Sequence, residues 1–261
     1  MRLVVAYFRR DLADDLAYRL TFLLELLDAL VLLAAVFLVS RGVGPVHVSG
    51  YEPFGFLFVG LAVNTALTVC LAAFATSVRG ARAHGMLRVS MILPIPPAVQ
   101  VVASAAYPFL RGFFDAGLHL VAAALFGLSL SLANVPAALL VFILGLGASA
   151  SVGIASAAFG MVFKRGDPLM WLFGVLGLVL GGVFYPVDLL PAALRAIAWL
   201  TPVAPTLAAM RPILLDGAPL SSVLTPVLAL SVYAGAGVPL SLMLFNAAVR
   251  KARRLGTIKE T

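Results

Sequence analysis

Charged residues are scarce in this sequence, and their scarcity excludes an ordinary water-soluble domain. Asp, Glu, Lys and Arg make up 11% of the 261 residues, whereas a soluble domain carries about 25%. Apolar residues make up 62%, and the mean hydropathy is +1.09. A globular core that buried every apolar stretch would leave almost no polar surface to face water. The composition therefore predicts a protein whose main solvent is the lipid bilayer.

Catalytic and metal-binding motifs are also missing. The only cysteine, Cys70, lies in an apolar run, which excludes an intrachain disulfide and a cysteine-ligated metal cluster. No lysine follows a glycine, so there is no phosphate-binding Gly-Lys loop, and no Gly-x-Ser-x-Gly elbow occurs. The three histidines lack a metal-binding spacing. We therefore expect no enzyme, metal site or cofactor in this chain, and set aside a membrane enzyme, which needs clustered His, Asp or Glu.

The net charge of +7 comes from 18 Lys and Arg against 11 Asp and Glu. These basic residues lie in short stretches between apolar runs, without interleaved aromatic residues, which argues against a nucleic-acid partner. Fourteen of them fall on one side of the alternating apolar runs, three on the other side (Arg41, Arg195 and Arg211) and one, Arg111, inside a run. Cytoplasmic loops of membrane proteins are basic. The bias predicts a multi-pass protein of the cell (inner) membrane with both termini in the cytoplasm.

Hydrophobic periodicity predicts an all-α integral membrane protein with six transmembrane helices. Residues 1–19 are too charged to span but have apolar side chains at helical spacing, so we expect an interfacial amphipathic helix there. Residues 20–250 form one transmembrane domain, and residues 251–261 form a cytoplasmic tail. The six expected spans, each about 20 residues or longer, are Leu20–Val39, Phe54–Val78, Ala98–Leu128, Val135–Phe163, Leu169–Val187 and Leu224–Val249.

The segment between the fifth and sixth spans is rich in proline. It contains two apolar stretches that are too short to span, Ala192–Leu200 and Thr206–Leu215. Non-helical backbone at membrane depth has to be sheltered by protein. We expect one or two short re-entrant helices in the outer leaflet, and the alternative is a surface loop with an interfacial helix.

Polar residues recur every three or four positions along the third span. Arg111 and Asp115 stand four residues apart, and because a charge in hydrocarbon is costly, we expect them to neutralise each other. The stripe either lines a translocation path or fixes helix packing, and the mutual pairing favours the packing role. Its members are Gln100, Ser104, Arg111, Asp115 and His119.

Two acidic residues, Glu25 and Asp28, lie one to two turns into the first span. They either snorkel to the interface, bind a cation, or meet a basic group of a neighbouring helix, and we favour the basic group. Its candidates are Arg79, Arg82 and Arg111.

Small residues recur every four positions in the fourth and fifth spans, and such faces allow helices to approach closely. We expect packing within one subunit rather than a dedicated dimer seam, although both readings are open. The residues are Gly145, Ser149, Gly153 and Ala157 in the fourth span, and Gly177 and Gly181 in the fifth.

Three stretches together resemble a known family. The first is the basic helix that leads into residues 18–22. The second is the cytoplasmic loop with Gly85-Met86-Leu87-Arg88 and Leu93-Pro94-Ile95-Pro96, and the third runs from Gly181 to Pro191 and on through Trp199–Pro202 to Met210-Arg211. A Gly-rich span end, a proline-marked break and a following Pro-to-Arg segment rarely coincide by chance. With the order of spans, they resemble the type-2 ABC exporter permeases over essentially the whole chain.

The resemblance implies a permease that pairs with a second, identical or similar permease subunit and with ABC ATP-binding subunits that hold ATP and magnesium. It also implies an ATPase-coupling loop after the second span and an extracellular gate segment after the fifth. The loop residues are Gly85, Met86, Leu87, Arg88, Pro94 and Pro96, with Arg88 where the family is usually acidic. The gate residues are Tyr185, Pro186, Asp188, Pro191 and Pro202.

We therefore predict an ATP-driven exporter subunit that moves a hydrophobic or lipid-like substrate across the membrane by alternating access. The main alternative is a secondary transporter or channel without an ATPase partner. No internal inverted repeat or pair of broken spans is evident in the sequence to favour that alternative.

Overall fold

The structure is a computed structural model that describes residues 2–17, 19–43, 48–83, 96–104, 106–162 and 168–254. This part of the chain is helical apart from turns, short irregular segments and one isolated bridge between Val48 and Tyr51. The helices are α1 (Arg2–Ala17), α2 (Arg19–Val43), α3 (Pro53–Ala83), α5 (Pro97–Ser104), α6 (Ala106–Leu125), α7 (Val135–Val162), α8 (Pro168–Leu180), α9 (Ala192–Trp199), α10 (Val203–Asp216), α11 (Leu224–Val232) and α12 (Val238–Arg254). The predicted all-α class is confirmed.

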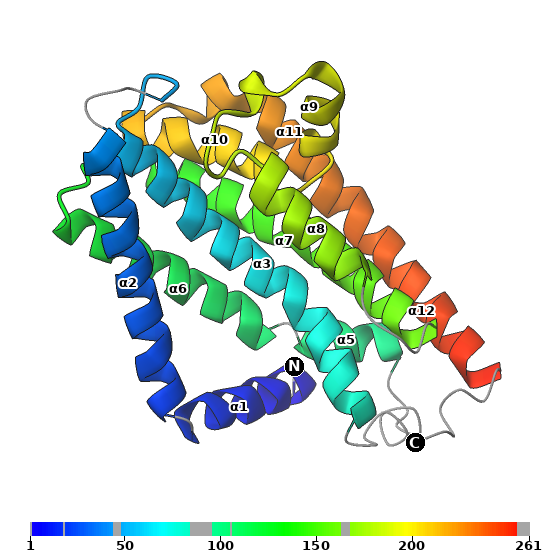
Figure 1. Cartoon of the computed structure of the whole chain (residues 1–261). Coiled ribbons are helices and arrows are strands. Elements are labelled where there is room, and N and C mark those ends of the chain that lie inside the picture. The colour runs from blue at the N-terminus through cyan, green and yellow to red at the C-terminus, as the bar shows by residue number, and fades with distance from the viewer. Residues whose placement is uncertain are drawn as a thin grey trace.

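The long helices run side by side, and short elements lie at both ends of them (Figure 1). Helix α1 lies across one end, at a steep angle to α2, whereas α9 and α10 lie at the opposite end. The predicted short helices at Ala192–Leu200 and Thr206–Leu215 correspond to α9 and α10. The predicted interfacial segment corresponds to α1.

Three helices are long and apolar enough to cross a membrane: Pro53–Gly80, Val135–Val162 and Leu220–Ala252. Helices α9 and α10 pass the same test as a pair, bent by 85° at their break, which fits either a broken span or a re-entrant loop. Two shorter apolar helices cover Leu30–Gly42 and Leu169–Leu180. By this test the described residues supply three of the six predicted spans, and the bent pair lies in the segment that was predicted to be re-entrant.

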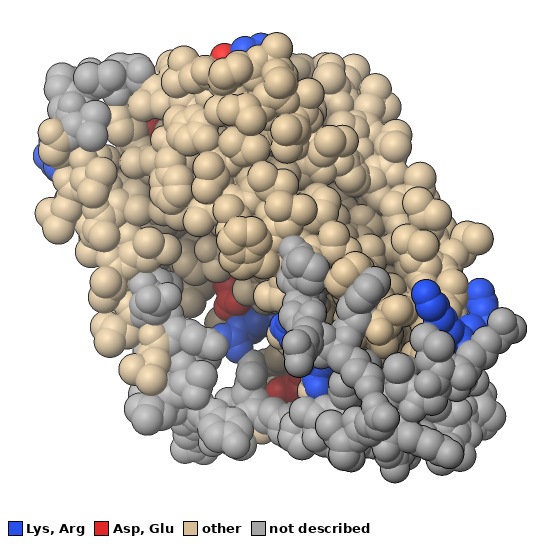
Figure 2. All heavy atoms as spheres, turned by 45° about the vertical axis from the view of Figure 1, so that its right-hand side comes forward, with Lys and Arg blue, Asp and Glu red and all other residues tan. Residues whose placement is uncertain are grey.

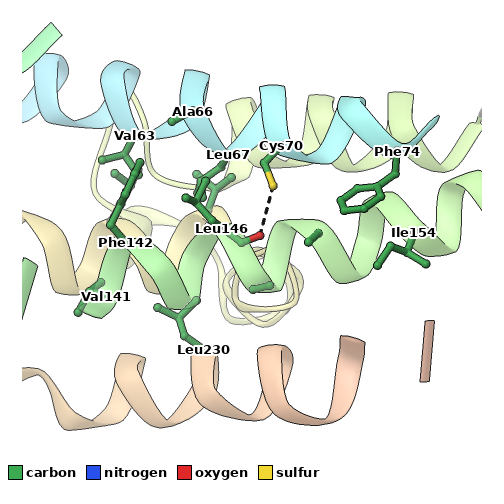
Figure 3. Close-up of a cluster of buried hydrophobic side chains, with 14 of the residues drawn as sticks. Val63, Ala66, Leu67, Cys70, Phe74, Val141, Phe142, Leu146, Ile154 and Leu230 are labelled. Carbon is green, nitrogen blue, oxygen red and sulfur yellow. Dashed lines mark hydrogen bonds between the residues drawn. The ribbon is translucent and has the colours of Figure 1, made fainter. Parts of the chain in front are cut away.

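The centre of the protein is the contact between α3 and α7 (Figure 3). Leu67 and Cys70 of α3 pack against Leu146 of α7, and the Cys70 thiol donates to the Leu146 carbonyl at 3.5 Å. The close approach of α3 and α7 depends on glycine in α7, because a Cβ on Gly153 would lie 2.5 Å from the Leu71 carbonyl oxygen of α3. The small-residue face of α7 is therefore buried within the chain, which confirms the packing reading of that stripe.

Helix α8 ends earlier than expected. The fifth span was predicted to reach Val187, but the helix stops at Leu180 and turns at Gly182, whose φ of +80° favours glycine. The apolar run in the sequence continues past the end of the helix because Val183, which is no longer helical, is still buried in the core. The break therefore lies inside the protein rather than at its surface.

The last long helix contains a π-helical turn, η3 (Tyr233–Gly237), between α11 and α12. The Tyr233 hydroxyl donates to the Leu200 carbonyl at 2.5 Å, which ties this turn to the end of α9. Many large apolar side chains are exposed, and the face shown in Figure 2 carries few charged side chains, which lie at its edges and in a hollow in the lower part of the view. This distribution fits a protein surrounded by lipid.

Candidate functional site

A buried arginine, Arg211, joins three segments at the end of the protein where α9 and α10 lie. Its side chain comes from α10 and is only 7% exposed. The Nη2 atom donates to the carbonyl oxygens of Gly182 at 2.7 Å and Val183 at 3.1 Å. Nε and Nη2 both donate to the Phe56 carbonyl of α3, at 3.3 and 3.1 Å. We call Arg211, Phe56, Gly60, Gly182 and Val183 the Arg211 junction.

The charge of Arg211 is balanced without an acidic partner. Among the described residues, no carboxylate forms an ion pair with its guanidinium. Two of its three carbonyl partners, Gly182 and Val183, lie in the turn that follows the carboxyl end of α8, where the last helix carbonyls lack intrahelical donors and carry partial negative charge. The guanidinium also lies 3.5 Å from the centre of the Phe56 ring, a cation–π contact. A helix that breaks inside a membrane protein needs such donors.

Gly60 makes this arrangement possible. It follows Phe56 by one turn on the same face of α3, and a Cβ there would lie 2.5 Å from the Val183 carbonyl oxygen. The same Cβ would lie 2.7 Å from Nη2 of Arg211. Any other residue would push the turn after α8 away from α3.

One turn further along this face lies Asn64, a polar residue in an apolar setting. It is 9% exposed, and its Oδ1 atom accepts no hydrogen bond from the described residues. Oδ1 lies 3.8 Å from the position a Cβ would take on Gly177 of α8. The Cβ positions of Gly177 and Gly181 both contact Val203 of α10. Helices α3, α8 and α10 therefore meet at Asn64, below the Arg211 junction.

The predicted gate residues lie around this break in α8. Tyr185 follows it, and its hydroxyl donates to the Val179 carbonyl. Pro186, Pro191 and Pro202 directly precede η1 (Val187–Leu189), α9 and α10. The Asp188 side chain is 90% exposed and lies 4.0 Å from the Arg195 guanidinium.

A tyrosine outside the spans, Tyr51, lies beside Asp216 at the same end of the protein. Tyr51 precedes α3, and Asp216 ends α10. Burial raises the pKa of Tyr51 to about 12, with further increases from a hydrogen bond to the Asp216 side chain and from its negative charge, whereas the positive charge of Arg211 lowers it. The phenol is therefore neutral at physiological pH.

The predicted polar stripe is partly assembled. Arg111 Nε lies 3.0 Å from Asp115 Oδ1, and the two side chains are 18% and 21% exposed, so the pairing expected for them is confirmed. His119 Nδ1 bonds to the Asp115 carbonyl at 2.6 Å within the same helix. Gln100 and Ser104 are buried in α5. The side chains of Glu25 and Asp28 lie outside the described residues.

The predicted coupling loop lies mostly outside the described residues, which include only Pro96 of its six members. The described elements around it form a connected unit. Helix α1 packs against α5 and α6, and the Phe8 and Tyr107 rings meet edge to face with centroids 5.6 Å apart. The five members outside the described part are Gly85, Met86, Leu87, Arg88 and Pro94.

Sequence reasoning did not single out Arg211, Gly60 or Asn64 as site residues. Arg211 was counted among the few basic residues on the side with little charge and marked the end of the Pro-to-Arg segment in the family resemblance, without a role of its own. Its position could have indicated a site, because a lone arginine in an apolar stretch after proline-marked breaks needs hydrogen-bond acceptors inside the protein. For Gly60, nothing in the local sequence marks the close approach.

The described residues form a helical membrane protein with three candidate spans and one bent helix pair, and many transporters contain broken helices of this kind. A family model described as ABC-2 type transporter matches residues 3–215. The chain therefore belongs to the ABC-2 type transporter family and is a permease subunit, the membrane-spanning rather than the nucleotide-binding part of an ABC transporter. A search of curated proteins finds no match.

Proposed function

We propose that this permease is the membrane subunit of an exporter driven by ATP hydrolysis in a partner subunit. The observation that carries the proposal is the ABC-2 family match over residues 3–215. Two permease subunits, identical or similar, would enclose the path in the cell (inner) membrane, and both termini of this chain would lie in the cytoplasm. ATP and magnesium would bind in the partner, and this chain would contribute no catalytic residue.

The arrangement of α1, α5 and α6 supports a role in receiving force. The coupling loop leads directly into α5, and α5 and α1 contact each other at the same end of the protein. Movement of the loop would therefore reach α6 through packed helices rather than through a flexible chain. Packed elements transmit displacement because the interior is dense.

The break after α8 supports a gate at the opposite end. Helix α8 ends inside the protein, and α9 and α10 follow it with a bend of 85° between them. Because the helix is already interrupted there, the segment after α8 could move without breaking many backbone hydrogen bonds. Alternating access would open this segment when the coupling end closes. The small number of polar groups along α3, α8 and α10 favours a hydrophobic or lipid-like substrate.

The first test is co-purification of the tagged full chain with the ATP-binding protein encoded by a neighbouring reading frame. We expect a stable complex that hydrolyses ATP, and reconstituted vesicles that export a lipid analogue only with ATP. Transport driven by an ion gradient, with no ATP-hydrolysing companion, would instead establish the secondary-transporter alternative.

The coupling loop gives a second test on the same complex. Replacing Leu87 and Arg88 with alanine should lower substrate-stimulated ATP hydrolysis without reducing complex yield. Leu132→Ala is the matched control, because that leucine is 78% exposed on the apolar surface. Unchanged coupling in the loop variant would count against the loop assignment.

A further inference from the structure

The contacts of Arg211 differ on its two sides. Toward α3, two nitrogen atoms donate to the Phe56 carbonyl and the guanidinium rests on the Phe56 ring. Toward the turn after α8, Nη2 alone donates to Gly182 and Val183. Each side therefore has two hydrogen bonds, those to the turn being the shorter, and only the α3 side adds a contact with an aromatic ring.

We propose that Arg211 is the latch of the gate: it holds the turn after α8 in the closed state and releases Gly182 and Val183, but not Phe56, when the path opens. Helix α10 then stays with α3, and the moving part is the end of α8 with its turn. This inference rests on the proposed function, because it assigns a step of the transport cycle to one positioning residue.

Asn64 gives independent support for movement of α8 away from α3. A buried polar atom without a partner costs about 1–3 kcal/mol, and such atoms are rare in folded proteins. The Asn64 Oδ1 atom faces α8 at Gly177. Displacement of α8 would let water or a donor group on the cargo reach that oxygen, so the open state removes a cost that the closed state carries.

The test uses a cysteine at position 64 as a reporter of opening. The full chain carries Asn64→Cys with Cys70→Ala and is labelled in sealed vesicles with a membrane-impermeant maleimide applied at the α9–α10 side. Labelling rates are compared between the reporter alone and the reporter with Arg211→Met or Arg211→Lys. The native chain, with Cys70 as its single cysteine, is labelled in parallel with and without Arg211→Met.

Cys70 distinguishes release of the latch from general loosening. It lies on α3 within two turns of Asn64, but it is 0% exposed and bonds to α7, not to α8. We expect Arg211→Met to raise the labelling rate at position 64 by about tenfold or more, as expected for loss of hydrogen bonds to a charged group. Cys70 should stay unlabelled. Arg211→Lys should fall between, because an ammonium can donate to some of the same carbonyls.

Gly60→Ala provides a second variant that does not remove the arginine. Its Cβ would press on the Val183 carbonyl and on Nη2 of Arg211, so it should also expose the reporter. This variant decides the question if Arg211→Met does not fold, as judged by size-exclusion chromatography. The proposal would be overturned if folded reporter chains with Gly60→Ala or Arg211→Met were labelled at the same rate as the reporter chain with native Gly60 and Arg211. An equal rise in the labelling of Cys70 would overturn it as well.

These measurements need no ATP, so they separate the latch from the proposed function. If the latch variants expose the reporter but ATP and vanadate do not change labelling of the complex, the latch holds and the ATP-driven cycle fails. If ATP and vanadate change labelling but the variants do not, the cycle holds and the latch fails.

Discussion

A disulfide between α8 and α10 should stop the transport cycle. The pair is Gly177→Cys with Val203→Cys, made in a Cys70→Ala background so that no other thiol is present. The Cβ position on Gly177 lies 3.7 Å from the Cβ of Val203. Cβ atoms of native disulfides lie about 3.5–4.5 Å apart. The bond should therefore form in the closed state with little movement of the backbone.

The effect should be large because the bond limits the separation that opening requires. Disulfides hold their Cα atoms within about 7 Å, so α8 could not leave α10. The bond closes a loop of about 25 residues, and loops of this size gain roughly 3–4 kcal/mol in the chain-entropy account. Oxidation should therefore raise the thermal unfolding midpoint as well as block opening.

The assay is ATP hydrolysis by the purified complex before and after reduction, with bond formation quantified by mass-tagged maleimide after denaturation. Oxidised complex should lose most substrate-stimulated activity and regain it with reductant. The matched control is Gly147→Cys with Ala234→Cys, which links α7 to the π-helical turn across 3.3 Å and should leave activity intact. Full activity in a complex whose α8–α10 bond is complete would refute the idea that α8 moves relative to α10.

Three further predictions concern stability and protonation. Gly153→Val should destabilise the chain by about 1–3 kcal/mol through overpacking against the Leu71 carbonyl, whereas Gly160→Ala, with no atom within 4 Å of its Cβ position, should not; thermal unfolding in detergent compares them. Asp115→Asn should destabilise the chain by about 1 kcal/mol by removing the partly exposed ion pair with Arg111, and Arg111→Leu with Asp115→Leu should recover much of the folded yield. Tyr51 holds its proton more tightly when folded, with a pKa of about 12 against 10, so its contribution is complete below pH 10 and is lost as the pH rises to 12; absorbance at about 295 nm should show a late-titrating phenol that Tyr51→Phe removes, and titration of that phenol at its ordinary pKa would contradict this.

Much of the fold followed from apolar periodicity. Helices α3 and α7 fit the expected spans because their runs are long, and their ends are marked by proline or charge. The end of α8 was placed seven residues too late, at Val187 instead of Leu180, because hydropathy records burial and not helicity. Gly181 and Gly182 were read as part of a Gly-rich span end, whereas they form its terminating turn.

The candidate site was harder to predict because it depends on contacts between distant segments. The Arg111–Asp115 pair was accessible from the sequence, since both residues lie on one helix four positions apart. Arg211 meets Phe56 across 155 positions, and no local spacing indicates which carbonyls a buried guanidinium reaches. Gly60 has the same difficulty, because its requirement comes from the neighbouring turn and not from its own backbone angles.

Arg211 is bound by backbone oxygens and not by a carboxylate, and this has an electrical consequence. The atoms that leave the guanidinium on opening belong to neutral peptide groups, and the cation itself stays on α3. A membrane voltage does work only on charge that moves across the field, about 2.3 kcal/mol per elementary charge per 100 mV. Opening at this end should therefore carry almost no gating charge, and its rate should be the same in polarised and depolarised vesicles.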